Sequence, residues 1–107
     1  MALSVVDRHE LHDLLTGGTP VVADFYADWC APCHALSPEL ESLQARLGDT
    51  VRFVKVDVDA NPELATELGV MSIPTVIHFS ADGKEAARTV GAQRADRLAR
   101  SLGLKVD

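Results

Sequence analysis

One stretch decides the fold, residues 21–34, which reads VVADFYADWCAPCH. Its first seven residues are apolar on both alternations except at Asp24, a pattern that predicts a central strand covered on both faces. Cys30 and Cys33, the two cysteines of the chain, follow at a spacing that puts both side chains on one face of a helix, within reach of each other. The stretch therefore predicts a strand-to-helix turn that carries a cysteine pair, with a carboxyl buried in the strand beside it.

A long amphipathic helix is predicted directly after the cysteines. Leucines recur there at positions 36, 40, 43 and 47, the period of a helix that lies against a sheet, and Gly48 suits the C-terminal cap. Pro38 removes one backbone hydrogen bond, so we expect it to kink this helix without ending it, because the leucine period continues past it.

The remaining elements alternate between helix and strand. Asp7 and Glu10 have the spacing of a capping box at the start of a helix, and Asn61-Pro62 opens another helix as N-cap and first helical residue. The other predicted elements are strands over 51–58, 75–80 and about 87–90, a hairpin turn at 81–84, and a final helix with Ala95, Leu98 and Leu102. This alternation predicts the α/β class, with one domain over residues 1–107, a mixed sheet, and helices on both faces.

The overall composition excludes several classes of function. The net charge of −6 makes a nucleic-acid backbone an unfavourable partner, and Arg94, Arg97 and Arg100 recur at a spacing that fits a solvated helix face. The chain has no apolar run long enough to span a membrane and no secretory-signal pattern at its start, so we expect a cytoplasmic protein without membrane contact. In a reducing cytosol, a lone disulfide is more often catalytic than structural.

The sequence resembles the thioredoxin family in two segments. Residues 23–33 are similar to the segment that carries the redox-active cysteines of that family, and residues 70–75, VMSIPT, are similar to its cis-proline segment. The resemblance implies the thioredoxin fold, a central mixed sheet of about five strands with four helices packed on its two faces. It also implies a monomeric protein-disulfide reductase that binds no cofactor or metal. Such a protein receives electrons from NADPH through a thioredoxin reductase and passes them to disulfide-containing target proteins.

Three residues are expected to carry the reaction. Cys30 precedes the first turn of the predicted helix, where unpaired N–H groups and the helix dipole favour the thiolate that attacks a substrate disulfide. Cys33 is expected to resolve the mixed disulfide, because its attack on Cys30 is intramolecular. The resemblance implies that the carboxyl of Asp24 acts as the base for Cys33, with Lys55 nearby, the one charged residue of its strand expected to point inward.

Further residues are expected to receive the substrate or to tune the cysteine pair. The resemblance implies a flat apolar patch for substrate binding, formed by Trp29, Ala31, Pro32, Ile73, Pro74, Gly91 and Ala92. In this patch, Trp29 is the expected anchor, and Ile73 offers its backbone to an extended substrate segment. The residues expected to set the redox properties are Ala31, Pro32, His34 and Lys55. At the first and third of these positions the family more often has glycine and lysine.

Two cofactor-binding interpretations compete with the redox pair. Residues 30–34 also match the C-x-x-C-H pattern of c-type haem attachment, with Met71 available as a second axial ligand, although the strand-rich context argues against haem. A zinc site is a weaker interpretation, because His9, His12 and His78 are scattered and no second ligand pair has a recognisable spacing.

Two alternatives keep the same fold but change the function. The chain is a binding subunit if the surface around Trp29 and Pro74 holds a partner whether or not the sulfurs react. The other alternative is an exported protein of the same fold, either a disulfide oxidase whose cysteine pair donates its disulfide to targets or a maturation reductase. The Ala-Pro dipeptide between the cysteines and the absent signal pattern argue against the exported forms.

Overall fold

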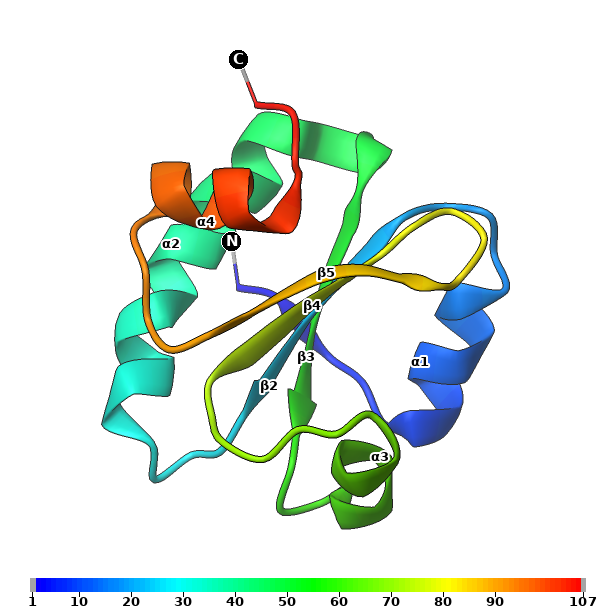
Figure 1. The fold of residues 1–107 in the computed structure, drawn as a ribbon, viewed down its shortest axis with the longest axis vertical. Helices are drawn as coiled ribbons and strands as arrows, with labels where there is room; N and C mark the ends of the chain where they lie inside the picture. The colour runs from blue at the N-terminus through cyan, green and yellow to red at the C-terminus, as the bar shows by residue number, and fades with distance from the viewer. Residues whose placement is uncertain (1, 107) are drawn as a thin grey trace.

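A five-stranded sheet runs through the middle of the protein and carries helices on both faces (Figure 1). The structure is a computed structural model, and it describes residues 2–106. The elements follow in the order β1 (Ser4–Val5), α1 (Arg8–Leu15), β2 (Val21–Tyr26), α2 (Ala31–Leu47), η1 (Gly48–Thr50), β3 (Arg52–Asp57), α3 (Pro62–Glu67), β4 (Thr75–Phe79), β5 (Glu85–Val90) and α4 (Ala95–Leu102). The predicted fold class, a mixed sheet of five strands with four α-helices, is confirmed.

The strand order places β2 at the centre of the sheet. The order is β1-β3-β2-β4-β5, and β3 pairs in parallel with both β1 and β2, whereas β4 pairs antiparallel with β2 and β5. Asp24, in the middle of β2, lies opposite Lys55 of β3 and Val76 of β4. Because directly opposite residues point to the same face of a sheet, Asp24 and Lys55 share one face.

The side chains of β2 alternate between two buried clusters, one on each face of the sheet. Val22 packs with side chains of α2 and α4, whereas Val21, Ala23 and Phe25 pack with side chains of α1 and α3. In Figure 1, α2 and α4 lie on one side of the sheet and α1 and α3 on the other. All residues of β2 are buried, as predicted for a central strand. By the same alternation, Asp24 is on the α2 face with Val22.

Most predicted strands form with slightly different ends. β3 and β4 are shorter than the predicted ranges 51–58 and 75–80, and β5 begins at Glu85 rather than near residue 87. The earlier start of β5 follows from an irregularity in its pairing with β4 between His78 and Phe79, which brings Glu85 into register. The sequence pattern does not predict β1, because a strand of two residues is too short to show a period; it forms by pairing with the edge of β3.

The two predicted helix starts have different outcomes. The capping box of α1 is confirmed, since Asp7 Oδ1 accepts from the Glu10 N–H at 2.8 Å and Glu10 Oε1 accepts from the Asp7 N–H at 3.0 Å. Asn61 is the N-cap residue of α3, as predicted, but its side chain makes no capping hydrogen bond. Instead, Asn61 Oδ1 accepts from the Arg8 N–H at 3.1 Å, and Nδ2 donates to the Asp57 carbonyl at 3.0 Å. The tertiary contact with α1 has replaced the local cap.

The long helix α2 supports the site and matches its prediction closely. Three of its leucines are fully buried against the sheet, and the helix continues through Pro38 as expected. Gly48 caps its end with a φ of 57°, a backbone conformation that favours glycine. Although α2 has 17 residues, no helix within residues 2–106 is both long and apolar enough to cross a membrane.

Candidate active site

The cysteine pair lies between the end of β2 and the start of α2. Cys30 is the N-cap residue of α2, with an extended backbone, and Cys33 belongs to the first turn. A disulfide joins them, with their Cα atoms 5.3 Å apart. The Cys33 N–H donates to Cys30 Sγ at 3.2 Å. The helix start therefore directs a backbone donor at Cys30, where it also stabilises a thiolate, and this geometry supports Cys30 as the attacking sulfur.

A groove of about 750 Å³ opens beside Cys30. Most of its lining is apolar and comes from three segments of the chain. The lining residues other than Cys30 are Trp29, Ala31, Pro32, Val58, Pro62, Ala65, Val70, Met71, Ser72 and Ile73. A concave apolar surface beside a reactive sulfur fits the docking of a protein segment that carries a disulfide.

Trp29 and Met71 are the most exposed large apolar side chains around this groove. Their exposed fractions are 71% and 96%, respectively. The Trp29 ring is held in place by its Nε1–H, which donates to Asp59 Oδ2 at 2.8 Å. Trp29 is therefore not part of the core, and its ring is available to a docked segment.

The groove contains only part of the predicted substrate patch. Trp29, Ala31, Pro32 and Ile73 line it, whereas Gly91 and Ala92 do not. The Gly91 N–H donates to the Pro74 carbonyl at 2.9 Å, beside the cis Ile73–Pro74 peptide bond. Pro74 itself is buried. Gly91 thus lies beside Pro74 and outside the groove lining, and its substrate role stays a prediction.

Some residues of the groove lining are not predicted by any pattern in the sequence. Val58 follows β3, and Pro62 and Ala65 belong to α3; all three line the groove together with Trp29, Cys30 and Ala31 although they lie far from them in sequence. Small apolar residues in a short helix carry no functional signal of their own. The following residues, Val70 and Ser72, belong to the segment that resembles the cis-proline segment, and that resemblance was the available signal for them.

Asp24 is a fully buried carboxyl on the face of the sheet that α2 covers. Neither of its oxygens has a hydrogen-bond partner among the described residues. Burial raises the pKa of Asp24 from 3.8 to about 7, and the positive charge of Lys55 opposes part of this rise. At neutral pH the carboxyl therefore exchanges readily between its protonated and charged forms, as a proton acceptor must.

Lys55 and Ser37 connect the surroundings of Asp24 to the cysteine pair. Both line a cavity of about 200 Å³ together with Asp24. Lys55 Nζ donates to Ser37 Oγ at 3.5 Å and lies 4.1 Å from the centre of the Tyr26 ring. Ser37 Oγ in turn donates to the Cys33 carbonyl at 3.3 Å. The predicted inward orientation of Lys55 is confirmed, and the same face of the sheet joins Asp24 to the first turn of α2.

Residues 3–103 match the family model described as Thioredoxin. The chain belongs to the thioredoxin family. This result agrees with the resemblance of the two sequence segments and with the disulfide that joins Cys30 and Cys33.

Individual thioredoxins are similar over nearly the full length. The chain is 44% identical over 102 residues to a thioredoxin of Mycolicibacterium smegmatis, covering 94% of this chain and 90% of that one. It is 39% identical over 102 residues to a bifunctional thioredoxin reductase/thioredoxin of Mycobacterium leprae, covering 95% of this chain but 22% of that protein. The structure of oxidised mitochondrial thioredoxin 3 of Saccharomyces cerevisiae superposes with a TM-score of 0.82 and 33% identity, covering 95% and 93% of the two chains.

Family membership and the cysteine pair together define the reaction class. The chain is a thiol–disulfide oxidoreductase of the protein-disulfide reductase type. In such proteins the two sulfurs themselves carry the electrons, so the chemistry needs no bound cofactor.

The C-x-x-C-H match belongs to this thioredoxin active-site segment. The two sulfurs are bonded to each other, and the His34 ring donates from Nε2 to the Asp28 carbonyl at 2.6 Å. That hydrogen bond ties the first turn of α2 to the residues just before Cys30. Met71 lies in the groove rather than facing His34 across a buried site.

The scattered histidines do not gather around the cysteines of this thioredoxin domain. His9 and His12 are on α1, and His78 Nδ1 donates to the Leu102 carbonyl at 2.7 Å, between β4 and α4. Within residues 2–106, no group of three or more His, Cys, Asp or Glu side chains is placed to hold a metal ion.

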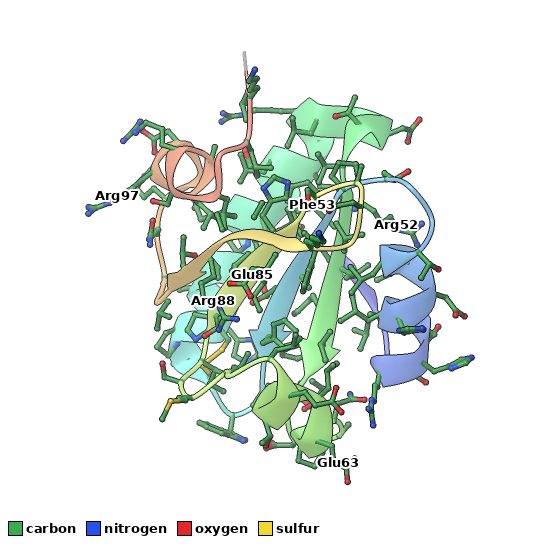
Figure 2. All side chains as sticks on the ribbon, turned by 45° about the vertical axis from the view of Figure 1, so that its right-hand side comes forward. Arg52, Phe53, Glu63, Glu85, Arg88 and Arg97 are labelled. Atoms are coloured by element: carbon green, nitrogen blue, oxygen red, sulfur yellow. A yellow bond between two sulfur atoms is a disulfide. The ribbon has the colours of Figure 1, made fainter. Side chains whose placement is uncertain are left out.

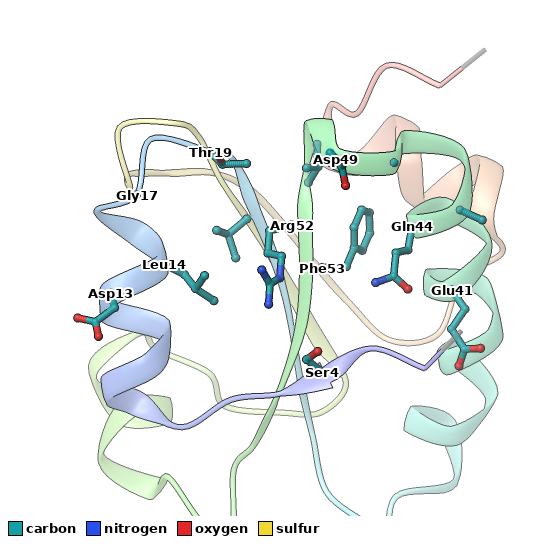
Figure 3. Close-up of a pocket in the computed structure, with 14 residues that line it drawn as sticks. Ser4, Asp13, Leu14, Gly17, Thr19, Glu41, Gln44, Asp49, Arg52 and Phe53 are labelled. Atoms are coloured by element: carbon teal, nitrogen blue, oxygen red, sulfur yellow. The ribbon is translucent and has the colours of Figure 1, made fainter.

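A larger hollow, of about 940 Å³, lies elsewhere on the thioredoxin fold. It opens between α1 and α2, and Figure 3 shows Leu14 and Arg52 projecting into it from α1 and β3. The acidic side chains of Asp13, Glu41 and Asp49 are also in its lining. None of the predicted site residues borders this hollow, so its size does not make it the active site.

Proposed function

We propose that the chain reduces protein disulfides in two steps, in which Cys30 attacks and Cys33 resolves. In the first step the Cys30 thiolate attacks one sulfur of the target disulfide. The target S–S bond breaks, a Cys30–target disulfide forms, and the departing target sulfur takes up a proton. In the second step Cys33 loses its proton and attacks Cys30 Sγ, which releases the second target sulfur and leaves the Cys30–Cys33 disulfide. Two electrons pass from the dithiol to the target.

The placement of Cys30 at the N-cap of α2 carries this proposal. Its sulfur accepts the Cys33 N–H and borders the groove, whereas Cys33 does not line the groove. A target sulfur that enters the groove therefore meets Cys30 first. Once the mixed disulfide has formed, Cys33 is held beside it, so the second step competes well with any external thiol.

Asp24 is proposed as the base that accepts the proton of Cys33. Its pKa of about 7 supports this role, because a proton acceptor works best when its pKa is near the working pH. Its place on the α2 face supports the role as well, since its cavity also contains Ser37, which binds the Cys33 carbonyl. Lys55, on the same face, is proposed to keep part of the Asp24 population charged.

The groove is proposed to bind the segment of the target that flanks its disulfide. Trp29 is the proposed anchor, because it is exposed and its ring is held by Asp59. Ile73 is proposed to present its backbone to this segment, with Pro74, Gly91 and Ala92 as further residues of the substrate site. The residues proposed to tune the redox potential are Ala31, Pro32 and His34, which all lie in the first turn of α2.

A thioredoxin reductase is the proposed electron donor, with NADPH as its source of electrons. The Mycobacterium leprae relative supports this proposal, because its name joins a thioredoxin reductase to a thioredoxin. We further propose that the chain works as one domain, as a monomer, and in the cytoplasm, where a reducing environment keeps thiols available.

Trapping the mixed disulfide tests the assignment of the two cysteines. Cys33→Ser removes the resolving sulfur but leaves Cys30, so targets should accumulate as covalent adducts that run as heavier bands on non-reducing gels and disappear on reduction. Cys30→Ser should form none, and it is the matched control because it also leaves one cysteine. Adducts on Cys30→Ser but not on Cys33→Ser would reverse the two roles.

Activity assays of the wild-type protein distinguish the proposed function from its alternatives. Wild-type protein with NADPH and a thioredoxin reductase should reduce the disulfides of insulin, and equilibration with glutathione should give a reducing potential. A strongly oxidising potential would instead support the disulfide oxidase. Retention of a biological activity in a complex after both cysteines are changed to serine would support the binding subunit.

A further inference from the structure

Part of the groove lining is formed by a loop with little regular structure. We call residues 68–73, which connect α3 to Pro74, the groove loop. Four of its residues, from Val70 to Ile73, line the groove. At its start the Gly69 N–H donates to the Thr66 carbonyl and the Val70 N–H donates to the Ala65 carbonyl at 2.8 Å, and further along the Ser72 carbonyl accepts from Thr75 Oγ1 at 2.6 Å. The width of the groove therefore depends on what else holds this loop.

Arg88 of β5 holds the beginning of the groove loop from outside. Its Nη2 donates to the Leu68 carbonyl at 2.7 Å, and its Nη1 donates to the Gly69 carbonyl at 3.4 Å. These carbonyls follow the last turn of α3, where backbone acceptors have no partner within the helix. Arg88 lies opposite Ile77, which packs on the α3 face, so its side chain extends toward α3. The guanidinium thereby joins β5 to the loop, although the two are far apart in sequence.

Glu85 fixes the orientation of this guanidinium. Its two carboxylate oxygens accept from Arg88 Nε and Nη2, each at 2.6 Å, and Figure 2 shows the two side chains together on β5. Both side chains are only partly exposed, at 30% for Arg88 and 36% for Glu85. A planar guanidinium held by a carboxylate on one side presents its remaining N–H groups in a fixed direction. A lysine ammonium lacks this geometry.

We infer that Arg88, held by Glu85, is a positioning residue that fixes the groove loop and so sets the affinity for protein targets. The inference rests on the proposed function, because it assigns target binding to the groove. Arg88 does not touch the cysteines; it acts through Leu68 and Gly69 on the residues that follow them. Loss of the Arg88 hydrogen bonds to the groove loop should therefore weaken the docking of a protein segment and leave the chemistry of the sulfurs unchanged.

Steady-state kinetics of Arg88→Met with two substrates test this inference. Methionine keeps the length and apolar stem of the side chain but removes every donor. We expect KM for insulin to rise by about fivefold while kcat changes by less than about twofold. Reduction of hydroxyethyl disulfide, which is too small to need the groove, should change by less than about twofold. Arg88→Lys should give an intermediate KM, because one charge-assisted donor remains.

Arg97→Met is the matched control, since Arg97 is an exposed arginine on α4, which packs on the opposite face of the sheet (Figure 2). Its kinetics should equal those of the wild type. Amide hydrogen exchange should become faster at residues 70–73 in Arg88→Met but not in Arg97→Met. If Arg88→Met fails to fold, as thermal unfolding would show, Arg88→Lys and Glu85→Gln carry the same comparison.

Three outcomes separate this inference from the proposed function. An unchanged KM for Arg88→Met in an active protein would overturn the positioning role alone. A parallel loss with both substrates would also overturn it, because it would indicate general damage. A wild-type protein that reduces neither insulin nor hydroxyethyl disulfide would contradict the proposed function itself.

Discussion

Trp29 and Asp24 lie on two sides of the same disulfide and differ sharply in their surroundings. Trp29 is mostly exposed, at the edge of an apolar groove, and its one polar group is satisfied by Asp59. Asp24 is fully buried, and neither carboxylate oxygen has a partner among the described residues. We call these the groove side and the carboxyl side of the cysteine pair.

The difference shows how the molecule separates target recognition from proton chemistry. An exposed apolar surface costs little in the free protein and gains energy only when a target covers it. A buried, unpaired carboxyl affects the folded state at every pH above its ordinary titration range, whether or not a target is present. Changes on the groove side should therefore appear in KM, and changes on the carboxyl side should appear in stability and in the rate of the second step.

The largest expected effect is the pH dependence of stability that Asp24 creates. Its pKa is about 7 in the folded protein and close to the ordinary 3.8 in the unfolded chain. Between these values the folded state binds more protons, so the free energy of unfolding should fall as pH rises from 4 to 7 and level off above. The difference between the two pKa values corresponds to about 4 kcal/mol. Asp24→Asn should remove this slope, as urea unfolding at several pH values would show.

Asp49→Asn is the control for this measurement, because Asp49 is exposed beyond the end of α2. It should keep the slope of the wild type.

Asp24→Asn should also slow the release of target from the mixed disulfide, by on the order of ten- to a hundredfold, since the amide cannot accept the Cys33 proton. If Asp24→Asn kept the pH slope and the release rate of the wild type, burial would not raise the pKa of Asp24, and Asp24 would not be the base.

The carboxyl side was predictable from the sequence to a greater extent than the groove side. A single aspartate in the apolar run of residues 21–27 indicates a buried carboxyl, because a central strand has no solvated face. The helix α2 follows from the leucine period. Both features belong to elements whose residues follow a regular pattern.

The groove side depends on contacts between short segments, which leave no such pattern. α3 has six residues, and its contribution to the groove, from Pro62 and Ala65, becomes visible only when the chain is folded. Arg88 donates a hydrogen bond to the Leu68 carbonyl, twenty positions away in the sequence, and no sequence pattern near Arg88 indicates that contact. Gly91 was predicted in the substrate patch, yet its N–H binds Pro74 outside the groove lining.

Trp29→Ala tests the groove side with the next largest effect. We expect KM for insulin to rise by about tenfold, because a large exposed aromatic side chain in a docking surface is a typical binding hot spot. Stability should change little, since most of the ring contacts solvent in the free protein. Initial rates over a range of insulin concentrations, with the reductase in excess, would measure the change.

Two variants sharpen this result. Val5→Ala also truncates an exposed apolar side chain, but on the edge strand β1, so it should leave KM unchanged. Trp29→Phe keeps an aromatic ring but loses the hydrogen bond to Asp59, so a KM between those of wild type and Trp29→Ala is expected. If Trp29→Ala lowered kcat instead of raising KM, the division between the two sides of the disulfide would be wrong.

Met71 should give the smallest effect, although it is the most exposed large apolar side chain of the groove. Its side chain has few contacts to lose in the free protein, and a flexible thioether adapts to many partners without fixing any of them. We therefore expect Met71→Leu to leave KM for insulin unchanged and Met71→Lys to raise it by about two- to threefold, because a lysine ammonium resists desolvation under a bound target. Circular dichroism melting should be the same for all three proteins. If Met71→Lys raised KM as much as Trp29→Ala does, the main contact with the target would be made by the groove loop rather than by Trp29.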